Sequence, residues 1–251
     1  QDDALLTKLA TSGVLARCDG TETFRDVNKN TLCDTKTVSL HLVEKGWTAE
    51  ALLLWVARKM DPPFRALIDS GALITGFSNE QVVRFCLTHG LSWAHAAVFL
   101  DSQDRQMAVY KSGGEPVPLS QCSVSPRDRF TFYDQCHTTG MDIKQALDSC
   151  AVATLAKSMV MRDHTQACWR MRQLGEGQTI VVVIVPEVAK MIAETKLGDE
   201  KQVRERTKRW DGHNLTSDRN QPHLMLADVL LWLVHSSLGQ ETMMRTQLLV
   251  Q

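Results

Sequence analysis

The chain has 251 residues, of which 43% are hydrophobic and 23% are charged, and its formal net charge at pH 7 is -1. This length and composition exclude a disordered chain and allow one large globular domain or two small ones. The balanced charge excludes a general electrostatic attraction to nucleic acid or to anionic membranes, so we expect neither as a partner.

The apolar runs and the cysteines indicate the cellular compartment in which the protein is expected. The apolar run over residues 180–185, like every other apolar run in the sequence, has too few residues to cross a bilayer. The seven cysteines are scattered without a Cys-x-x-Cys pair, which predicts free thiols in a reducing compartment and no metal site. We therefore expect an intracellular, cytoplasmic protein. Because the chain starts with Gln1 rather than Met, we also expect a piece of a longer polypeptide.

The N-terminal half predicts alternating helices and strands. In chain order it predicts a loop over residues 1–40, a helix over 47–60, a buried strand over 66–68, a helix over 78–90 and a buried strand over 95–101. Thr48 is placed to cap the first helix. Ser78 and Gln81 form a capping box that opens the second helix, which we expect to end at Gly90.

The C-terminal half continues the alternation. It predicts a short strand and a Gly- and Pro-rich excursion over 106–119, strands over 129–134 and 151–155, a helix over 162–174, a buried strand over 178–185 and a helix over 186–196. Pro186 suits the first position of that last helix. A charged connector over 198–214 and an apolar helix over 223–238 follow.

This order of elements predicts an α/β fold with a mostly parallel sheet, helices on both faces and flanking helical segments. We expect an N-terminal loop and helical segment over residues 1–63, an α/β lobe over 64–198, and a connector with a C-terminal helix over 199–251. In such sheets ligands bind at the carboxyl ends of the strands, so polar clusters at those ends are the candidate sites.

The first cluster is the loop after the strand predicted over 129–134. It contains His137, Thr138, Thr139, Gly140 and Asp142. The threonines and the glycine can turn tightly and offer backbone N–H groups, while the histidine and the aspartate add an imidazole and a carboxylate. The alternative is a polar strand-to-helix turn in which the aspartate is the helix N-cap.

The second cluster lies on the helix predicted over 162–174. Gln166, Arg170 and Gln173 fall at i, i+4 and i+7 and share one helix face, and Arg172 follows closely. A guanidinium suits a phosphate because it donates paired hydrogen bonds and keeps its charge. The alternative is that these arginines form ordinary ion pairs on the surface.

A thiol nucleophile is the third chemistry to consider. Cys136 and His137 are adjacent, and on an extended chain adjacent side chains point to opposite faces, which argues against a dyad. Cys168 lies on the arginine-bearing helix and could approach the loop in space, but no protease-like local pattern surrounds it. Buried, unreactive thiols are therefore the expectation for the cysteines.

Taken together, the two polar clusters resemble motifs V and VI of the second RecA-like lobe of superfamily-two helicases, especially of SecA-type translocases. The matching stretches are "HTTGMDI" and "RDHTQACWRMRQLGEGQ". The resemblance implies a RecA-like lobe in which Gln166 and Arg170 reach a nucleotide, ATP with Mg²⁺, that is bound by an upstream lobe of the same polypeptide. Arg172 stands one residue short of the usual second arginine.

The chain also resembles a family of very large proteins of fungi and protists that are commonly labelled ubiquitin hydrolases. The resemblance spans residues 66–188 and rests on "LIDSGALITGFSNE", "HTTGMDI" and "MVMRDHTQACWRMRQLGEGQTI". It implies, as an alternative, part of a thiol-dependent deubiquitinase that acts on ubiquitin or ubiquitinated protein, with Cys168 and His137 as the catalytic pair. A second alternative is an inactive lobe kept as a scaffold or binding module.

The helicase-like reading assigns each residue a role. The candidate catalytic residues would be Gln166 and Arg170, which would sense the γ-phosphate, and His137, which with the loop up to Asp142 would couple that state to movement. The nucleotide-contacting residues would be Thr138, Thr139, Gly140, Asp142 and Arg172. No GxxxxGK[ST] sequence occurs in the chain, so on this reading the segment alone hydrolyses nothing.

Overall fold

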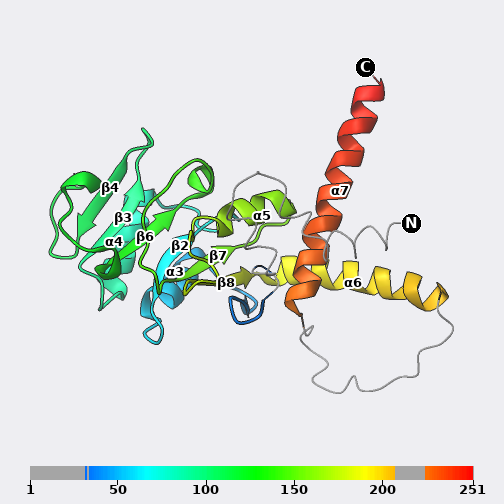
Figure 1. Cartoon of the computed structure of the whole chain (residues 1–251), viewed down its shortest axis with the longest axis horizontal. Helices are drawn as coiled ribbons and strands as arrows, with labels where there is room; N and C mark the ends of the chain where they lie inside the picture. Colours follow the sequence, from blue (N-terminus) through cyan, green and yellow to red (C-terminus); the bar gives the residue numbers. More distant parts are fainter. Residues whose placement is uncertain (1–31, 33, 207–223, 251) are drawn as a thin grey trace.

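The computed structural model describes residue 32, residues 34–206 and residues 224–250. Within these residues, the strands form one eight-stranded sheet (Figure 1). The strands are β1 Val38–Leu42, β2 Phe64–Ile68, β3 Ala96–Leu100, β4 Gln106–Tyr110, β5 Val117–Pro118, β6 Arg129–Tyr133, β7 Cys150–Thr154 and β8 Thr179–Ile184. The α-helices are α3 Ala49–Arg58, α4 Asn79–His89, α5 Met161–Cys168, α6 Pro186–Arg206 and α7 Leu226–Val250.

The strand order in the sheet is β1-β8-β7-β2-β6-β3-β4-β5. Neighbouring strands from β1 through β3 pair in parallel, whereas β4 pairs antiparallel with both β3 and β5. The predicted α/β fold with a mostly parallel sheet is therefore confirmed. The antiparallel edge arises because β3 and β4 are joined by a tight turn, which cannot return the chain to a parallel direction.

Helices cover both faces of the sheet. One apolar core lies between the sheet and α3 with α4, and includes Leu53, Val83, Phe130 and Phe132. The other lies between the opposite face and α5, α6 and α7. The sides are set by the alternation of side chains along each strand, so that Val182 joins one core and Val183 the other.

The predicted caps of α3 and α4 are present. The Thr48 hydroxyl accepts a hydrogen bond from the amide of Ala51 at 3.1 Å. Ser78 and Gln81 form the reciprocal capping box, and Gly90 follows the last turn of α4. A Cβ at Gly90 would lie 2.5 Å from the carbonyl oxygen of Ala57, so glycine is required there by the close approach of α3.

Several expectations about elements need correction. β1 forms in the stretch expected to be loop, and it joins the sheet on the N-terminal side of the boundary expected at residue 64. α5 ends at Cys168 rather than at residue 174, because residues 169–178 turn back to reach the start of β8. α6 continues to Arg206, into the expected connector, while residues 207–214 lie outside the described residues.

The C-terminal helix runs from Leu226 to Val250 and is longer than expected. Its first half packs against α5 and α6, and its second half extends away from the sheet (Figure 1). No helix in the described ranges combines the length and the apolar character that a membrane span requires.

Candidate functional site

The candidate site lies where the parallel strands β2, β6 and β3 end side by side. After β2 the chain crosses through α4 to β3, whereas after β6 it crosses in the opposite direction to β7. Two adjacent strands whose connections leave in opposite directions create a crevice at their carboxyl ends, the usual ligand position in open α/β sheets. Each of these strands is followed directly by an aspartate, namely Asp69, Asp134 and Asp101.

Asp101 is held by contacts within its own turn, whereas Asp69 is held by its own turn and by Thr154 at the end of β7. Burial raises the pKa of Asp69, while hydrogen bonds from Thr154 and from the amides of Ile74 and Leu73 act against that rise. Its Oδ1 lies 2.7 Å from the Thr154 hydroxyl. Asp101 pairs with Arg105 at 2.7 Å and accepts two backbone amides of the turn between β3 and β4. Both carboxylates therefore shape loops.

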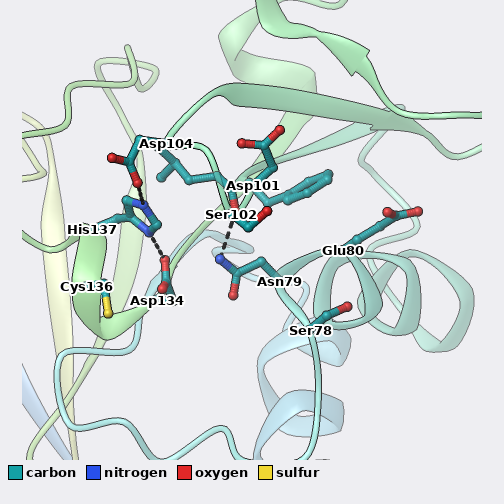
Figure 2. Close-up of a pocket in the computed structure, with 11 residues that line it drawn as sticks. Ser78, Asn79, Glu80, Asp101, Ser102, Asp104, Asp134, Cys136 and His137 are labelled. Carbon is teal, nitrogen blue, oxygen red and sulfur yellow. Dashed lines mark hydrogen bonds and ion pairs between the residues drawn. The ribbon is translucent and has the colours of Figure 1, made fainter.

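Asp134 differs because it faces His137 (Figure 2). The imidazole lies between two carboxylates, with Nδ1 hydrogen-bonded to Asp134 and Nε2 2.9 Å from Oδ1 of Asp104. Burial alone would lower the pKa of His137, but the hydrogen bonds and negative charges of the two aspartates outweigh it and raise that pKa. Since both ring nitrogens face acceptors, the arrangement favours the doubly protonated, charged imidazolium.

A pocket of about 560 Å³ opens beside His137. Figure 2 shows its polar side chains, which come from the start of α4, the turn after β3 and the loop after β6. The polar members of the lining are Ser78, Asn79, Glu80, Asp101, Ser102, Asp104, Asp134, Cys136 and His137. The lining therefore combines carboxylates, hydroxyls and one imidazole. Even so, no group of three potential metal ligands among the described residues is placed to hold a metal ion.

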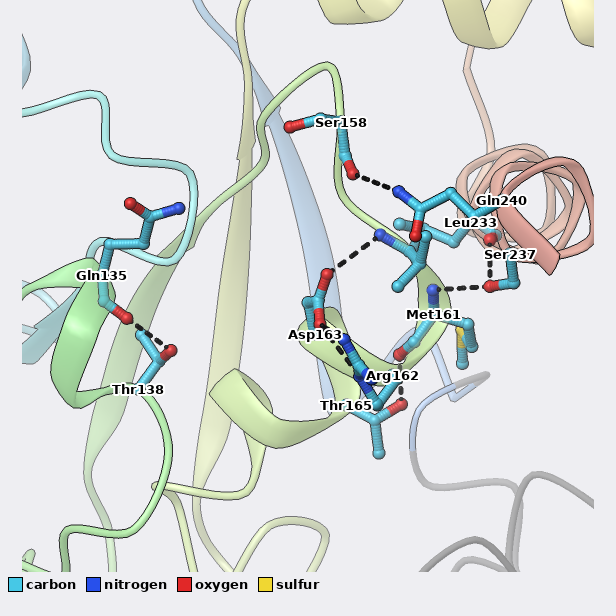
Figure 3. Close-up of polar contacts among 11 residues, drawn as sticks. Gln135, Thr138, Ser158, Met161, Arg162, Asp163, Thr165, Leu233, Ser237 and Gln240 are labelled. Carbon is cyan, nitrogen blue, oxygen red and sulfur yellow. Dashed lines mark hydrogen bonds and ion pairs between the residues drawn. The ribbon is translucent and has the colours of Figure 1, made fainter. Parts of the chain in front are cut away.

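The loop "HTTGMD" divides into two parts that face different neighbours. His137 belongs to the pocket, and Thr138 is buried with its hydroxyl donating to the carbonyl of Gln135 at 2.9 Å (Figure 3). Gly140 has a φ of +77°, a conformation that favours glycine, and Thr139 is exposed. Asp142 is exposed and forms no helix N-cap, because the next described helix begins at Met161.

The loop and the second cluster meet through Asp142. Its Oδ1 lies 3.3 Å from Nε of Arg172, whose side chain is exposed. Arg170 is 6% exposed, and neither its Nε nor its Nη1 has a hydrogen-bond partner within the described part of the chain. Burial lowers the pKa of Arg170, and so does the charge of Arg172, while Tyr133 and Asp142 act in the opposite direction.

The expected helical stripe of Gln166, Arg170 and Gln173 is not formed. Gln166 is on α5 and exposed, whereas Arg170 and Gln173 lie after its end at Cys168. The structure therefore brings Arg170 and Arg172 to the loop, and it leaves Gln166 on the surface of the helix. The start of α5 is fixed by α7 (Figure 3), where the Met161 amide donates to the Ser237 hydroxyl at 3.1 Å.

Cys168 contacts a histidine, but a different one from the expected partner. Its Sγ lies 3.6 Å from Nε2 of His164, and both side chains are completely buried. Burial raises the pKa of Cys168 to about 12 and lowers the pKa of His164 to about 4. The pair is therefore a neutral thiol beside a neutral imidazole, whereas His137 pairs with aspartates.

Sequence reasoning missed three side chains in this region. Asp104 and Asp134 hold the imidazole of His137, and Arg129 is buried on β6 with its Nε unpartnered among the described residues. The recurrence of aspartate after three apolar strands was the available signal for Asp134. Nothing in the sequence indicates Asp104. This residue lies in the turn between β3 and β4, has a φ of +60°, and contacts His137 from there.

Comparison with known proteins gives no relative for this chain. No protein-family model, no curated protein and no solved structure matches it. The fold places the chain in the class of α/β proteins with a mostly parallel sheet.

Proposed function

We propose that the chain is a RecA-like lobe whose strand ends respond to a nucleotide held by another lobe of the same polypeptide. The observation that carries the proposal is Arg170. Its buried guanidinium lies beside the loop of Asp142 with two nitrogens unpartnered by described residues. A buried charge without a hydrogen-bonded counterion is costly, and a phosphate oxygen is a suitable acceptor for it.

The position of the loop supports the same function. Residues 138–142 follow β6 at the topological switch point, and the ion pair of Asp142 with Arg172 links the loop to the segment after α5. A phosphate bound at Arg170 would therefore also affect the position of the loop and of the end of β6. ATP with Mg²⁺ is the proposed ligand, and this chain supplies guanidinium and backbone donors to its phosphates.

The alternative functions have less support. A thiol hydrolase needs a thiolate with an accessible sulfur, and Cys168 is completely buried with a raised pKa. A deubiquitinase centred on Cys168 and His137 therefore has no geometric support here. An inactive scaffold or binding module would not be stabilised by nucleotide. The nucleotide-binding experiment described next therefore tests this alternative as well.

The proposal requires Arg170 and the loop to contact the phosphates directly. This chain should therefore bind nucleotide weakly even without the other lobe, and that binding tests the proposal. We expect MgATP at millimolar concentration to raise the thermal unfolding midpoint of the wild-type chain without being hydrolysed. A ligand at ten times its Kd contributes about 1.4 kcal/mol to the free energy of unfolding, a shift that calorimetry resolves. Arg170→Met should remove the ligand-induced shift.

Arg162→Ala is the matched control. Arg162 lies on α5, is exposed and pairs only with the adjacent Asp163 among the contacts described, so its loss should leave the ligand-induced shift intact. An absent shift in the wild-type chain, or an equal shift in the Arg170→Met variant, would refute the proposal.

A further inference from the structure

The sheet splits next to the pocket that contains His137. Among the described residues, the pairing of β3 with β6 runs from Ala96 opposite Arg129 to Val98 opposite Thr131 and ends there. Beyond this point the last residues of β3 continue to pair with β4, whereas those of β6 pair with β2. The β3–β4 hairpin therefore diverges from β6, and the pocket is lined both by the turn of that hairpin and by the loop after β6.

A side-chain contact crosses this split. Nε2 of His137, in the loop after β6, lies 2.9 Å from Oδ1 of Asp104, in the turn between β3 and β4 (Figure 2). Nδ1 of the same ring is hydrogen-bonded to Asp134 on its own loop. The side chain of His137 is 11% exposed and that of Asp104 is 71% exposed. The imidazole therefore connects two segments that the backbone pairing of the sheet leaves apart.

The contact with Asp104 requires a proton on His137. A neutral imidazole carries one N–H and can therefore donate to only one of the two aspartates. Asp134 lies three residues from His137 on the same loop and its side chain is 25% exposed, so the neutral ring keeps that bond. Asp104 is the better hydrated of the two aspartates, and it loses its hydrogen bond when the ring becomes neutral.

The other titratable and charged groups of the elements around the pocket have surroundings of their own. They are Asp69, Glu80, Arg84, Asp101, Arg105 and Cys136. Asp101 pairs with Arg105 at 2.7 Å within the turn, and Glu80 pairs with Arg84 at 2.7 Å on α4. Asp69 is held by amides of its own turn, and Cys136 is exposed. The two aspartates in contact with the ring are therefore the groups that control its proton.

We propose that the contact between His137 and Asp104 is a proton-dependent clasp across the split of the sheet, which holds the β3–β4 turn to the loop after β6 and releases it when His137 becomes neutral. This inference goes beyond the proposed function and does not depend on it. The two aspartates outweigh burial and raise the pKa of His137. The clasp is therefore closed below that raised pKa and opens as the pH rises through it.

Opening of the clasp frees the turn rather than the whole hairpin. At the start of α4, Nδ2 of Asn79 donates to the carbonyl of Leu100 at 2.8 Å, which fixes the end of β3 independently of the clasp. Residues 102–105 are exposed, and the Asp101 amide donates to the Arg105 carbonyl at 3.1 Å, so the turn stays folded. The turn can then move as a unit relative to the loop after β6, and the freed Nε2 becomes an acceptor for a ligand in the pocket.

Solution NMR of the isotope-labelled chain tests the clasp between about pH 6 and about pH 9. The ring signals of His137 should titrate with a midpoint above 6.5, and the nuclear Overhauser contact between that ring and Asp104 should be lost over the same range. The heteronuclear Overhauser values of the amides of residues 102–105, which report motion on the picosecond to nanosecond timescale, should fall with the same midpoint.

Two variants separate the clasp from other effects of pH. Asp104→Asn removes the charge, keeps the shape of the side chain and suits the φ of +60° at this position. In this variant the turn should be more mobile than in the wild-type chain at about pH 6 and should change less with pH. Glu80→Gln is the matched control, because Glu80 lines the same pocket but pairs with Arg84. The pH-dependent change of the turn should remain in it.

The outcomes that overturn the clasp are distinct from those that test Arg170. If the mobility of the turn stays constant while His137 titrates, the contact does not hold the turn and the proposal is wrong. It is equally wrong if Asp104→Asn keeps the full wild-type change, or if His137 titrates below 6.5. None of these results alters the nucleotide experiment, which uses Arg170 and not the clasp.

Discussion

Among the described residues, Arg170 is the buried side chain with the most hydrogen-bond donors that lack an acceptor. Without an anion, its charge is buried with little compensation, and replacing such a group by an apolar one of similar length is often neutral or stabilising. Arg170→Met should therefore raise the free energy of unfolding by about 0–4 kcal/mol in phosphate-free buffer. Urea denaturation measures this change. A loss of more than about 1 kcal/mol would instead show that the guanidinium is satisfied in the folded chain.

His137 makes the stability of the fold depend on pH. Its pKa is raised in the folded state from the ordinary value of 6.5, by Asp104 and Asp134 against the effect of burial. The folded chain therefore binds the proton more tightly, and the stabilisation is fully present below pH 6.5 and is lost as pH rises through the raised pKa.

Urea denaturation at a series of pH values tests this linkage. The wild-type chain should be more stable than the His137→Gln variant at pH values just below 6.5, and the difference should shrink as the pH rises above that value. Asp104→Asn removes one of the two acceptors and should flatten the same dependence in part. A difference that grows with pH would contradict the assigned cause.

The cysteines should differ sharply in reactivity. Cys136 is exposed, whereas Cys168 is completely buried and its pKa is raised to about 12. Iodoacetamide should therefore modify Cys136 in the native chain and reach Cys168 only after unfolding. Peptide mass spectrometry after native and denaturing labelling distinguishes the two sites. Rapid native labelling of Cys168 would revive the thiol-hydrolase alternative.

Among the helices, the contact of α3 with the end of α4 is the most sensitive to a small change. Gly90 lies where an added Cβ would approach the Ala57 carbonyl to 2.5 Å, and backbone cannot yield as a flexible side chain would. Gly90→Ala should therefore destabilise the chain by about 1–3 kcal/mol. Thermal or urea unfolding measures this loss.

Gly198 provides the opposite control for the same substitution. It lies within α6, and nothing described lies within 4 Å of a Cβ built there. Gly198→Ala should stabilise the chain by up to about 1 kcal/mol, because alanine loses less backbone entropy in a helix. Equal effects at Gly90 and Gly198 would show that the approach to Ala57 is not the cause.

Local signals in the sequence were sufficient for elements that begin or end at specific side chains. Thr48, the Ser78–Gln81 capping box and Gly90 each act within one or two turns of their own helix, so their sequence spacing predicts their structure. The apolar strands at the centre of the sheet were equally clear, because strands buried on both faces are apolar along their whole length.

Elements that depend on distant partners were missed or given the wrong extent. β1 has a mixed composition and is stabilised by its pairing with β8. In this pairing Val38 lies opposite Ile180, which is about 140 residues later in the chain. α5 was expected to be longer because its sequence remains helix-compatible after Cys168. The position of β8 requires the chain to turn there instead.

For the chain as a whole, composition and the order of helices and strands were enough to predict an α/β protein with a mostly parallel sheet. They also located the polar loop after β6 as a candidate site, because residues that follow parallel strands gather at one edge of the sheet. Contacts between distant segments did not follow from spacing. Tertiary packing left Arg170 and Arg129 buried with guanidinium nitrogens unpartnered among the described residues, and it put Asp104 and Asp134 on either side of His137. Those positions depend on how strands and connections pack in three dimensions, which no local pattern encodes.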